Sequence, residues 1–535
     1  MRVLHVASEV APFAQTGGLA DVLAGLPAAQ VESGRVAAMA AAPAATARTI
    51  AMPTRRQAPE AVPPRAPVQA AVLVPLYRGV AARLAAAKIA LDDGIALPLQ
   101  IGPHAFEARL RRARVGAVEY GFLDCAGLYD RIGGLYGPMS SSEYTDNAVR
   151  FAALGRAALV AGERLLGGRA DVLHVHDWQG GAASIYAHLE RAERPGPPPA
   201  VVATIHNLAF RGVFDKTVMS ELGFPWDLFT RGGVEFYDQL SLLKGGLAYA
   251  DAVTTVSPSY AREILTPERG EGLDAFLRWD VARLIGIVNG IDEAAWDPRT
   301  DRAIAAGYSA DDLAGKARCR AALLAETGLA PVADDRPVIA AISRMSDQKG
   351  LDLLADIVPQ LGALGARLVV LGSGDPALEA RWRYLAESFR EHVAVKIGFD
   401  LPYARRVYAG SDLFVMPSRF EPCGLGQLYA MRYGSIPIVS SVGGLRDTVT
   451  DIGHGSIAGG GGRVGTGIRF DTVTAAALLA AIERGVKLVA DRTAVAQVRR
   501  AAMLRDSSWA GPARDYVALY ESLVARQRRS AVAAP

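Results

Sequence analysis

The sequence predicts an α/β protein with two domains, each built on a parallel sheet. Short apolar runs alternate with longer stretches of helical periodicity along the chain, which is typical of parallel strands joined by crossover helices. This alternation restarts after a turn-rich segment at 288–292. A chain of 535 residues is also too long for one ordinary core. We therefore place a first domain at 1–290 and a second at 291–508.

The first half opens with an apolar run at 3–7, a glycine-containing turn at 15–18 and a helical pattern over 19–30. Strand, loop and helix in this order make the first half of a crossover unit. Further strands are expected at 71–74, 171–175, 201–205 and 252–256.

The second half begins with an apolar run at 337–342. The strands expected after it lie at 367–371, 393–397, 412–416 and 436–439. The remaining segment, 509–535, carries a helical pattern over about 513–526, and we expect this helix to cross back to the first domain.

Residues 36–70 fit neither pattern. The segment is rich in Ala, Pro and Arg and contains no glycine and no aromatic residue. Because such a stretch has little to bury, we expect a disordered or loosely packed insertion.

The composition excludes several classes of protein. A net charge of +3 is nearly balanced, so we expect neither nucleic acid nor a membrane surface as a partner. No apolar run is long enough to span a bilayer. The three cysteines, Cys125, Cys319 and Cys423, are odd in number and far apart, which fits a reducing compartment. The first residues already read as a strand, so we expect a cytoplasmic protein.

The segment 418–425 is the most informative loop. It follows an apolar run at 413–417 and contains Glu421, a proline and a glycine. Ligands of open α/β sheets bind beyond the carboxyl ends of the strands, so Glu421 is placed to bind ligand hydroxyls. The alternative is an ordinary strand-to-helix turn with an acid near the helix N-terminus.

The loop 343–351 brings two cations to the end of another strand. Arg344 can bind a diphosphate with its forked guanidinium, and Lys349 adds a compact charge. Together they would stabilise the charge on a leaving nucleotide diphosphate without a metal. The alternative is two solvated surface cations.

The loop 15–21 carries Gly17 and Gly18 between a strand and a helix. Backbone N–H groups in such a loop, together with the helix N-terminus, favour an anion. A plain strand–helix turn remains the alternative, since two adjacent glycines are a weak signal.

Histidines at 174 and 176 alternate on one strand and precede Asp177. This pattern fits a packed or hydrogen-bonded histidine better than a metal ligand or a sugar contact, and we expect no metal. A loose dinucleotide fingerprint at 372–377 would indicate a dehydrogenase, but Pro376 lies in the turn and no acid follows at the required distance. Other common catalytic motifs are missing from the sequence.

Taken together in order, these loops resemble the bacterial glycogen synthase and starch synthase family. The resemblance runs from Met1 to about Tyr520, apart from 36–70. Beyond the loops above, the matching stretches are 144–147, 204–209, 250–251, 256–261, 289–292, 443–448 and 508–509. Many matches in one order make the resemblance specific, whereas no single motif would.

The resemblance implies two Rossmann-like domains facing each other across a cleft, the GT-B type of glycosyltransferase. It implies transfer of glucose from ADP-glucose to the 4-hydroxyl at the non-reducing end of an α-1,4-glucan such as glycogen, with retention and without a cofactor. Arg344 and Lys349 would hold the diphosphate, Glu421 the glucosyl hydroxyls, and His176 and Asp146 would line the glucose and acceptor side. The remaining donor-binding positions would be Gln15, Gly17, Gly18, Phe399, Cys423, Gly424, Leu425, Gly443 and Gly444. Phe399 stands where the family usually stacks a tyrosine on adenine, a change that keeps the ring face.

Two positions bear on the mechanism and the donor. Position 429 is a tyrosine, so no second carboxylate lies at the family-wide distance from Glu421, and front-face departure and attack fits better than double displacement.

Gln15 stands where the family has a lysine, and losing a charge-assisted contact costs roughly 1.5–3 kcal/mol. A catalytically weakened glucan-binding or regulatory protein, or a transferase using UDP-glucose, therefore remains an alternative.

Overall fold

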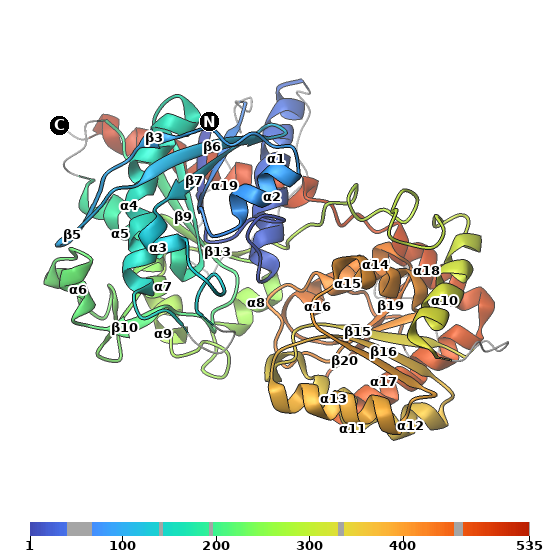
Figure 1. Ribbon diagram of the computed structural model, residues 1–535. Coiled ribbons are helices and arrows are strands. Elements are labelled where there is room, and N and C mark those ends of the chain that lie inside the picture. The colour runs from blue at the N-terminus through green and yellow to red at the C-terminus, as the bar shows by residue number, and fades with distance from the viewer. Residues whose placement is uncertain (40–66, 139–142, 192–195, 330–335, 454–463, 534–535) are drawn as a thin grey trace. The chain divides into compact units, whose positions relative to one another are not determined.

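The structure is a computed structural model that describes residues 1–39, 67–138, 143–191, 196–329, 336–453 and 464–533 (Figure 1). The chain forms two compact units. Unit 1 comprises Met1–Gly290 and Trp509–Pro535, and unit 2 comprises Ile291–Ser508. Both are α/β units with parallel sheets, which confirms the predicted fold class.

The sheet of unit 1 has nine strands in the order β14-β13-β9-β8-β1-β2-β7-β6-β3. Neighbours from β14 to β7 are parallel, and β6 and β3 are antiparallel additions at one edge. In that order the strands are Leu284–Gly286, Ala252–Thr255, Ala200–Ile205, Val172–His176, Arg2–Val6, Gln69–Pro75, Val118–Asp124, Arg109–Val115 and Ile95–Ala96. Smaller strands outside this sheet are β4 (Leu99–Ile101), β5 (His104–Phe106), β10 (Val213–Asp215), β11 (Glu235–Phe236) and β12 (Gln239–Ser241).

Helices cover both faces of this sheet because adjacent residues of a strand point to opposite faces. On β1, Leu4 faces Gly162 of α4, and His5 bonds Gln30 of α1. The C-terminal helix α19 lies beside α1, where Gly25 leaves no room for a Cβ against the indole of Trp509. The helices of unit 1 are α1 (Gly18–Met39), α2 (Val80–Ala86), α3 (Ala126–Tyr129), α4 (Asn147–Leu166), α5 (Asp177–Leu189), α6 (Val218–Glu221), η1 (Trp226–Leu228), α7 (Leu242–Ala248), α8 (Pro258–Glu263), α9 (Asp274–Trp279) and α19 (Ala510–Ala533).

The expected insertion at 36–70 is wrong at both ends. Helix α1 continues to Met39, and β2 begins at Gln69 with Val68 already buried. Continuous helical periodicity and strand pairing extend the regular elements into the Ala-rich sequence. The rest of the insertion, 40–66, lies outside the described residues.

The sheet of unit 2 has six strands in the order β17-β16-β15-β18-β19-β20, all parallel to their neighbours. In that order they are Val393–Ile397, Arg367–Gly372, Val338–Ile342, Leu413–Met416, Ile436–Ser440 and Ile468–Phe470. The side chains of β15 alternate between two cores, with Val338 and Ala340 in one and Ile339 and Ala341 in the other. A strand buried on both faces reads as the continuous apolar run seen in the sequence.

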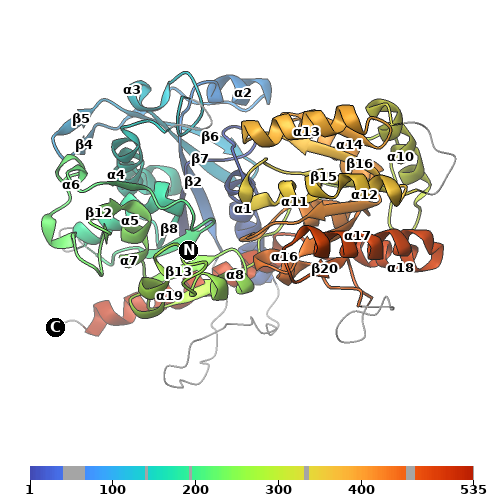
Figure 2. The same ribbon diagram turned by 90° about the horizontal axis from the view of Figure 1, so that it is seen from below.

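Each core of unit 2 is closed by its own set of helices (Figures 1 and 2). One core takes side chains from α10 (Ala314–Thr327), α14 (Leu401–Gly410), α15 (Gly426–Arg432) and α16 (Gly443–Thr448). The other takes them from α11 (Leu351–Asp356), α12 (Val358–Ala363), α13 (Pro376–Ser388) and α17 (Ala475–Ala490). The helix α18 (Arg492–Met503) lies beside α17 and contributes to both. No helix in the described ranges combines the length and apolar character needed to cross a bilayer.

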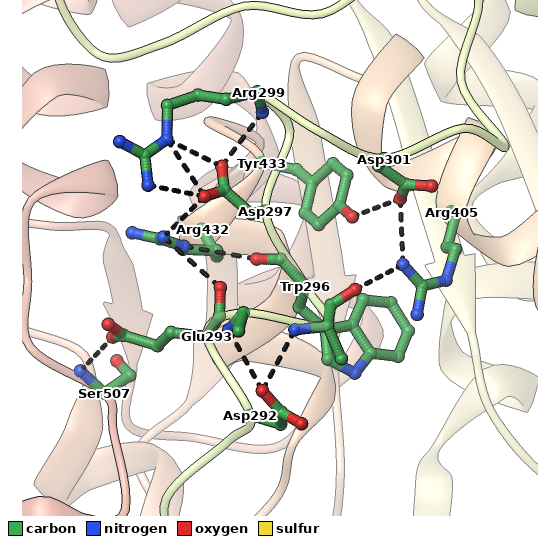
Figure 3. Close-up of polar contacts among 12 residues, drawn as sticks. Asp292, Glu293, Trp296, Asp297, Arg299, Asp301, Arg405, Arg432, Tyr433 and Ser507 are labelled. Atoms are coloured by element: carbon green, nitrogen blue, oxygen red, sulfur yellow. Dashed lines mark hydrogen bonds and ion pairs between the residues drawn. The ribbon is translucent and has the colours of Figure 1, made fainter.

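The first and last residues of unit 2, Ile291 and Ser508, form a parallel bridge. Figure 3 shows a polar network formed by residues that neighbour this pair in sequence, in which Ser507 N–H donates to Glu293 at 2.8 Å and Arg432 donates to the carbonyls of Glu293 and Trp296. The Trp296 ring also stacks on Tyr429, with centroids 3.8 Å apart. The two points where the chain enters and leaves unit 2 are thus held together.

Candidate active site

The loops that follow β15 and β18 bring Lys349 and Glu421 together in unit 2. Lys349 Nζ donates to Glu421 Oε2 at 2.6 Å, and Ser418 Oγ donates to the same oxygen at 3.1 Å. The Glu421 side chain is 6% exposed and that of Lys349 16%. The meeting follows from topology, because β15 and β18 are parallel neighbours whose carboxyl ends share one edge. The structure thus places a carboxylate and an ammonium group in contact at the edge of the sheet where open α/β proteins bind their ligands.

Arg419 joins the same two loops through contacts that the sequence did not predict. Its guanidinium donates to both carboxylate oxygens of Asp352 at 2.8 and 2.6 Å and to the Asp347 carbonyl at 2.7 Å. Its own N–H donates to the carbonyl of Gln348 at 2.9 Å. These contacts hold the short 3₁₀ helix η2 (Asp347–Lys349) in place. Arg419 thus positions the lysine that pairs with Glu421.

Arg344 and Phe399 also lie at the carboxyl edge of the unit 2 sheet, after β15 and β17. Both side chains are exposed, Phe399 by 82%. Within the described part of the chain, no hydrogen bond or ion pair involves the Arg344 guanidinium. Both groups are accessible to a ligand.

Gly444 has a packing role that the sequence did not predict, and the phosphate contact that the resemblance implies stays a prediction. Its N–H donates to the carbonyl of Glu421 at 3.0 Å, and an added Cβ would lie 2.2 Å from the carbonyl oxygen of Cys423. The N–H is therefore already used within the protein, and the missing side chain allows α16 to approach the loop. Gly443 precedes it with a positive φ of 38°.

Around the same loop, Cys423 is buried and Leu425 is the N-cap of α15. Gly424 has a φ of 74°, a conformation that favours glycine. The amide of Gln427 donates to the carbonyls of Cys423 and Gly424 at 3.0 and 2.9 Å. The backbone of this segment is thus held from within the unit.

The glycine loop of unit 1 is organised by Glu9, which the sequence reading missed. Its carboxylate accepts from Thr16 N–H at 2.6 Å, from Thr16 Oγ1 at 2.5 Å and from Gly17 N–H at 3.2 Å. In this conformation an internal carboxylate accepts from the Gly17 N–H, and the phosphate contact that the resemblance implies stays a prediction. Gly18 begins α1, so the helix N-terminus lies at the loop as expected.

Gln15 lies on the same loop and donates to Asp21 Oδ2 at 3.2 Å. Burial, together with the negative charge of Glu9, raises the pKa of Asp21 to about 7. A cation at position 15 would favour the ionised form of this acid. Because Gln15 is uncharged, position 15 supplies no cation to the Asp21 carboxyl group, whose pKa is about 7.

Asp146 lies at the N-cap of α4 and forms a two-pronged ion pair with Arg131 at 2.7 and 2.5 Å. The carboxylate is partly exposed. It can therefore accept a further hydrogen bond from a ligand hydroxyl.

His176, which the resemblance places on the sugar side, is fully buried. It ends β8, and its ring lies between His5 of β1 and His206, which follows β9. The structure therefore places its imidazole in the interior, in hydrogen-bond contact with His206, and its sugar contact stays a prediction. No local pattern in the sequence indicates this cluster, because strand register brings His5 and His174 to neighbouring positions on parallel strands.

Comparison with known proteins agrees with this geometry. Residues 2–53 and 54–279 match the starch synthase catalytic domain, and residues 336–486 match glycosyl transferases group 1. A glycogen synthase of Anaeromyxobacter dehalogenans is 44% identical over 524 residues, covering 98% of this chain and all of that protein. A glycogen synthase of Rhodopseudomonas palustris is 42% identical over 528 residues, covering 98% of each.

Solved structures give the same result. The catalytic domain of starch synthase IV from Arabidopsis thaliana, bound to ADP and acarbose, superposes with a TM-score of 0.83 at 29% identity, covering 98% of this chain and 99% of that one. A sucrose-phosphate synthase from Thermosynechococcus elongatus shares the fold, with a TM-score of 0.53 at 16% identity and coverage of 98% and 99%. The fold is the predicted GT-B type, and the chain belongs to the glycogen synthase and starch synthase family of retaining glycosyltransferases.

Proposed function

We propose that the protein transfers glucose from ADP-glucose to the non-reducing end of an α-1,4-glucan, with retention. The observation that carries this proposal is the Lys349–Glu421 pair beside an exposed Arg344 at the carboxyl edge of the unit 2 sheet. Two cations suit a departing diphosphate, and a carboxylate suits sugar hydroxyls. The names of the relatives, and the ADP bound to the Arabidopsis structure, support this substrate class.

In this proposal Arg344 and Lys349 neutralise the charge that develops on the leaving diphosphate. Glu421 accepts hydrogen bonds from the glucosyl hydroxyls, and Phe399 stacks on the adenine. Because Lys349 already pairs with Glu421, the ion pair orients both groups before the donor arrives. Tyr429 stacks on Trp296 and brings no second carboxylate, which agrees with departure and attack on one face.

In this proposal unit 1 also contributes groups that contact the substrates. Asp146, held by Arg131, accepts a hydroxyl of the sugar. The N-terminus of α1 faces the phosphates through its dipole, although Gly17 N–H is engaged by Glu9.

The identity of the nucleotide-sugar donor has a specific alternative. Gln15 replaces the lysine that the family resemblance leads us to expect, which favours either a weakened enzyme or a different nucleotide.

The three cysteines are free and buried, which supports the cytoplasm as the location of the protein.

The test is incorporation of labelled glucose into glycogen from ADP-glucose, with UDP-glucose in parallel, by wild type, Gln15→Lys and Glu421→Gln. We expect ADP-glucose activity in wild type and its loss in Glu421→Gln. A preference for UDP-glucose would overturn the donor assignment. Inactivity of wild type with both donors, rescued by Gln15→Lys, would support the weakened protein, and inactivity even in that variant would refute the transferase.

A further inference from the structure

A single chain of hydrogen bonds runs through the interior of unit 1 and links side chains from four strands and two helices to His206. The chain comprises His206, His176, His5, Gln30, Tyr520, His174, Thr204 and Thr254, in that order. All of these side chains except His206 are fully or almost fully buried. His206 lies at the surface end, just after β9, at the carboxyl edge of the sheet.

Seven contacts connect these side chains at hydrogen-bond distances. His206 Nε2 lies 2.9 Å from His176 Nδ1, and His176 Nε2 lies 3.1 Å from His5 Nδ1. His5 Nε2 lies 2.8 Å from Gln30 Oε1, and Gln30 Nε2 donates to the Tyr520 oxygen at 3.0 Å.

The second half of the chain continues from the helix α19. Tyr520 Oη lies 2.7 Å from His174 Nδ1, and His174 Nε2 lies 2.6 Å from Thr204 Oγ1. Thr204 Oγ1 in turn lies 2.6 Å from Thr254 Oγ1.

The four histidines of this hydrogen-bonded chain are neutral. Burial lowers the pKa of His5 to about 4 and that of His206 to about 3. It also lowers the pKa of His174 and His176 well below the ordinary range. A neutral imidazole has one donor nitrogen and one acceptor nitrogen.

The direction of every bond then follows from the amide of Gln30. Its oxygen can only accept, so His5 donates from Nε2 and must accept at Nδ1. His176 therefore donates from Nε2 and accepts at Nδ1, and His206 donates from Nε2. His206 Nδ1 is left as an acceptor, and no partner for it occurs among the residues that the structure describes.

The Gln30 amide also sets the hydrogen-bond directions in the part of the chain that runs through Tyr520 and His174. The amide nitrogen of Gln30 donates to Tyr520, which must donate its own proton to His174 Nδ1. His174 then donates from Nε2 to Thr204. All four histidines thus carry their proton on Nε2, and turning the Gln30 amide over would move all four protons to Nδ1.

We propose that Gln30 is a positioning residue that sets the tautomer of His206 through this chain, so that His206 Nδ1 accepts a hydrogen bond from a hydroxyl of the bound sugar. The sugar rests on the proposed function, whereas the tautomers do not. With the opposite tautomer, His206 Nδ1 would carry the proton and could only donate to the sugar hydroxyl. The hydroxyl would then have to donate its own proton to another acceptor.

A metal site is the main competing explanation. One ligand nitrogen from each of His5, His174 and His176 lies within 4.8 Å of the others. However, all six ring nitrogens of these residues already have hydrogen-bond partners. A bound ion would have to displace at least two of these contacts, so the hydrogen-bonded chain is favoured.

The first test is the ¹⁵N–¹H spectrum of the histidine rings in the full chain, assigned with single histidine variants. We expect His5, His174, His176 and His206 to be neutral with the proton on Nε2. Protons on Nδ1 in these rings would overturn the proposed direction. Added Zn²⁺ should leave the spectrum unchanged, and specific loss of the three clustered signals would identify a metal site instead.

The second test separates tautomer control from a merely structural role. Gln30→Met keeps the shape but removes both hydrogen bonds, so we expect mixed tautomers at His5, His176 and His206 and about a tenfold fall in kcat. The KM for the nucleotide sugar should stay unchanged. Gln527→Met is the matched control, since the partners of the Gln527 side chain of α19 among the described residues are Pro199 and Asp251, which do not belong to this hydrogen-bonded chain.

Gln30→Glu provides the rescue. An ionised carboxylate only accepts, so it keeps His5, His176 and His206 in the same tautomer while Tyr520 donates to it. His174 should then move its proton to Nδ1, and kcat should remain near that of wild type. Equal kcat in Gln30→Met and Gln527→Met, despite the expected tautomers, would refute the role in catalysis. An inactive wild type with these tautomers would refute the proposed function and, with it, the sugar contact, but not the chain.

Discussion

Lys349 Nζ lies 2.6 Å from Glu421 Oε2 although the two residues are 72 positions apart in sequence. The contact joins loops at the ends of neighbouring strands, and Arg419 ties the same loops together through Asp352. The cation and the carboxylate that we assign to donor binding are therefore one preorganised unit.

Removing the lysine should cost both stability and activity. In Lys349→Met the buried Glu421 loses its charged partner, and we expect about 2–3 kcal/mol of destabilisation. The rate with ADP-glucose should fall at least about 100-fold, because no ammonium faces the leaving diphosphate. Chemical denaturation of unit 2 and initial rates measure the two effects.

Two further variants separate these effects. Lys349→Met combined with Glu421→Gln removes the unpaired charge, so stability should partly recover while activity stays lost. Arg381→Met breaks an exposed pair with Asp356 and should change stability by less than about 1 kcal/mol, with unchanged rates. Normal activity in Lys349→Met would refute the assigned role.

Gln15→Lys should improve donor binding. The new ammonium can reach Asp21, whose pKa is raised to about 7, and should lower that pKa and add a charge-assisted contact to the donor phosphates. We expect about a 10- to 100-fold gain in kcat/KM for ADP-glucose. Gln100→Lys, at an exposed position of β4 in the same unit, adds the same charge as a control. Equal kcat/KM in Gln15→Lys and wild type would show that position 15 does not meet the donor.

Two glycines should respond differently to alanine. An added Cβ at Gly17 meets nothing within 4 Å, so Gly17→Ala should leave stability within about 0.5 kcal/mol of wild type. Any rise in its KM for ADP-glucose then reports the approach of the donor to this backbone. Gly444→Ala places the Cβ 2.2 Å from a carbonyl oxygen and should cost about 2 kcal/mol or more, with loss of activity. A fully stable Gly444→Ala would contradict the packing described for α16.

Unit 1 should lose stability on acidification. The pKa of each of the four chain histidines is lowered in the folded state, so between about pH 4.5 and 6 the unfolded chain takes up protons that the folded chain does not. Asp21 and Asp177 act in the opposite direction, because their pKa values are raised to about 7 and the folded state keeps their protons. The unfolded chain thus binds about two more protons from these six groups, so stability should fall by roughly 2.7 kcal/mol per pH unit.

Hydrogen exchange of the amides of β8, corrected for the intrinsic effect of pH, measures this opening free energy. His174→Gln should reduce the slope by about one proton, and Asp177→Asn should increase it by about one. An opening free energy that rises on acidification would contradict neutral histidines in the folded state.

The local sequence was sufficient for the fold class and the family. Apolar runs such as 337–342 mark strands buried on both faces, and the loops after them fall at one edge because parallel strands share a direction. Glu421, Arg344 and Lys349 could be chosen in advance, since charged groups placed directly after such strands have a known position. Their roles remain predictions.

The details of the site needed the tertiary structure. Whether Gly17 and Gly444 offer their N–H groups to a ligand depends on Glu9 and on the Glu421 carbonyl, which no local pattern identifies. His5 and His174 meet only through strand register, and Gln30 and Tyr520 are 490 residues apart. By itself, the sequence determined the central strands of both sheets and the loops at their ends, because hydrophobic periodicity is local, whereas strands nearer the sheet edges, such as β6, β14 and β20, were not predicted. Which donors and acceptors are already satisfied was decided only by long-range packing, because a hydrogen bond depends on both partners.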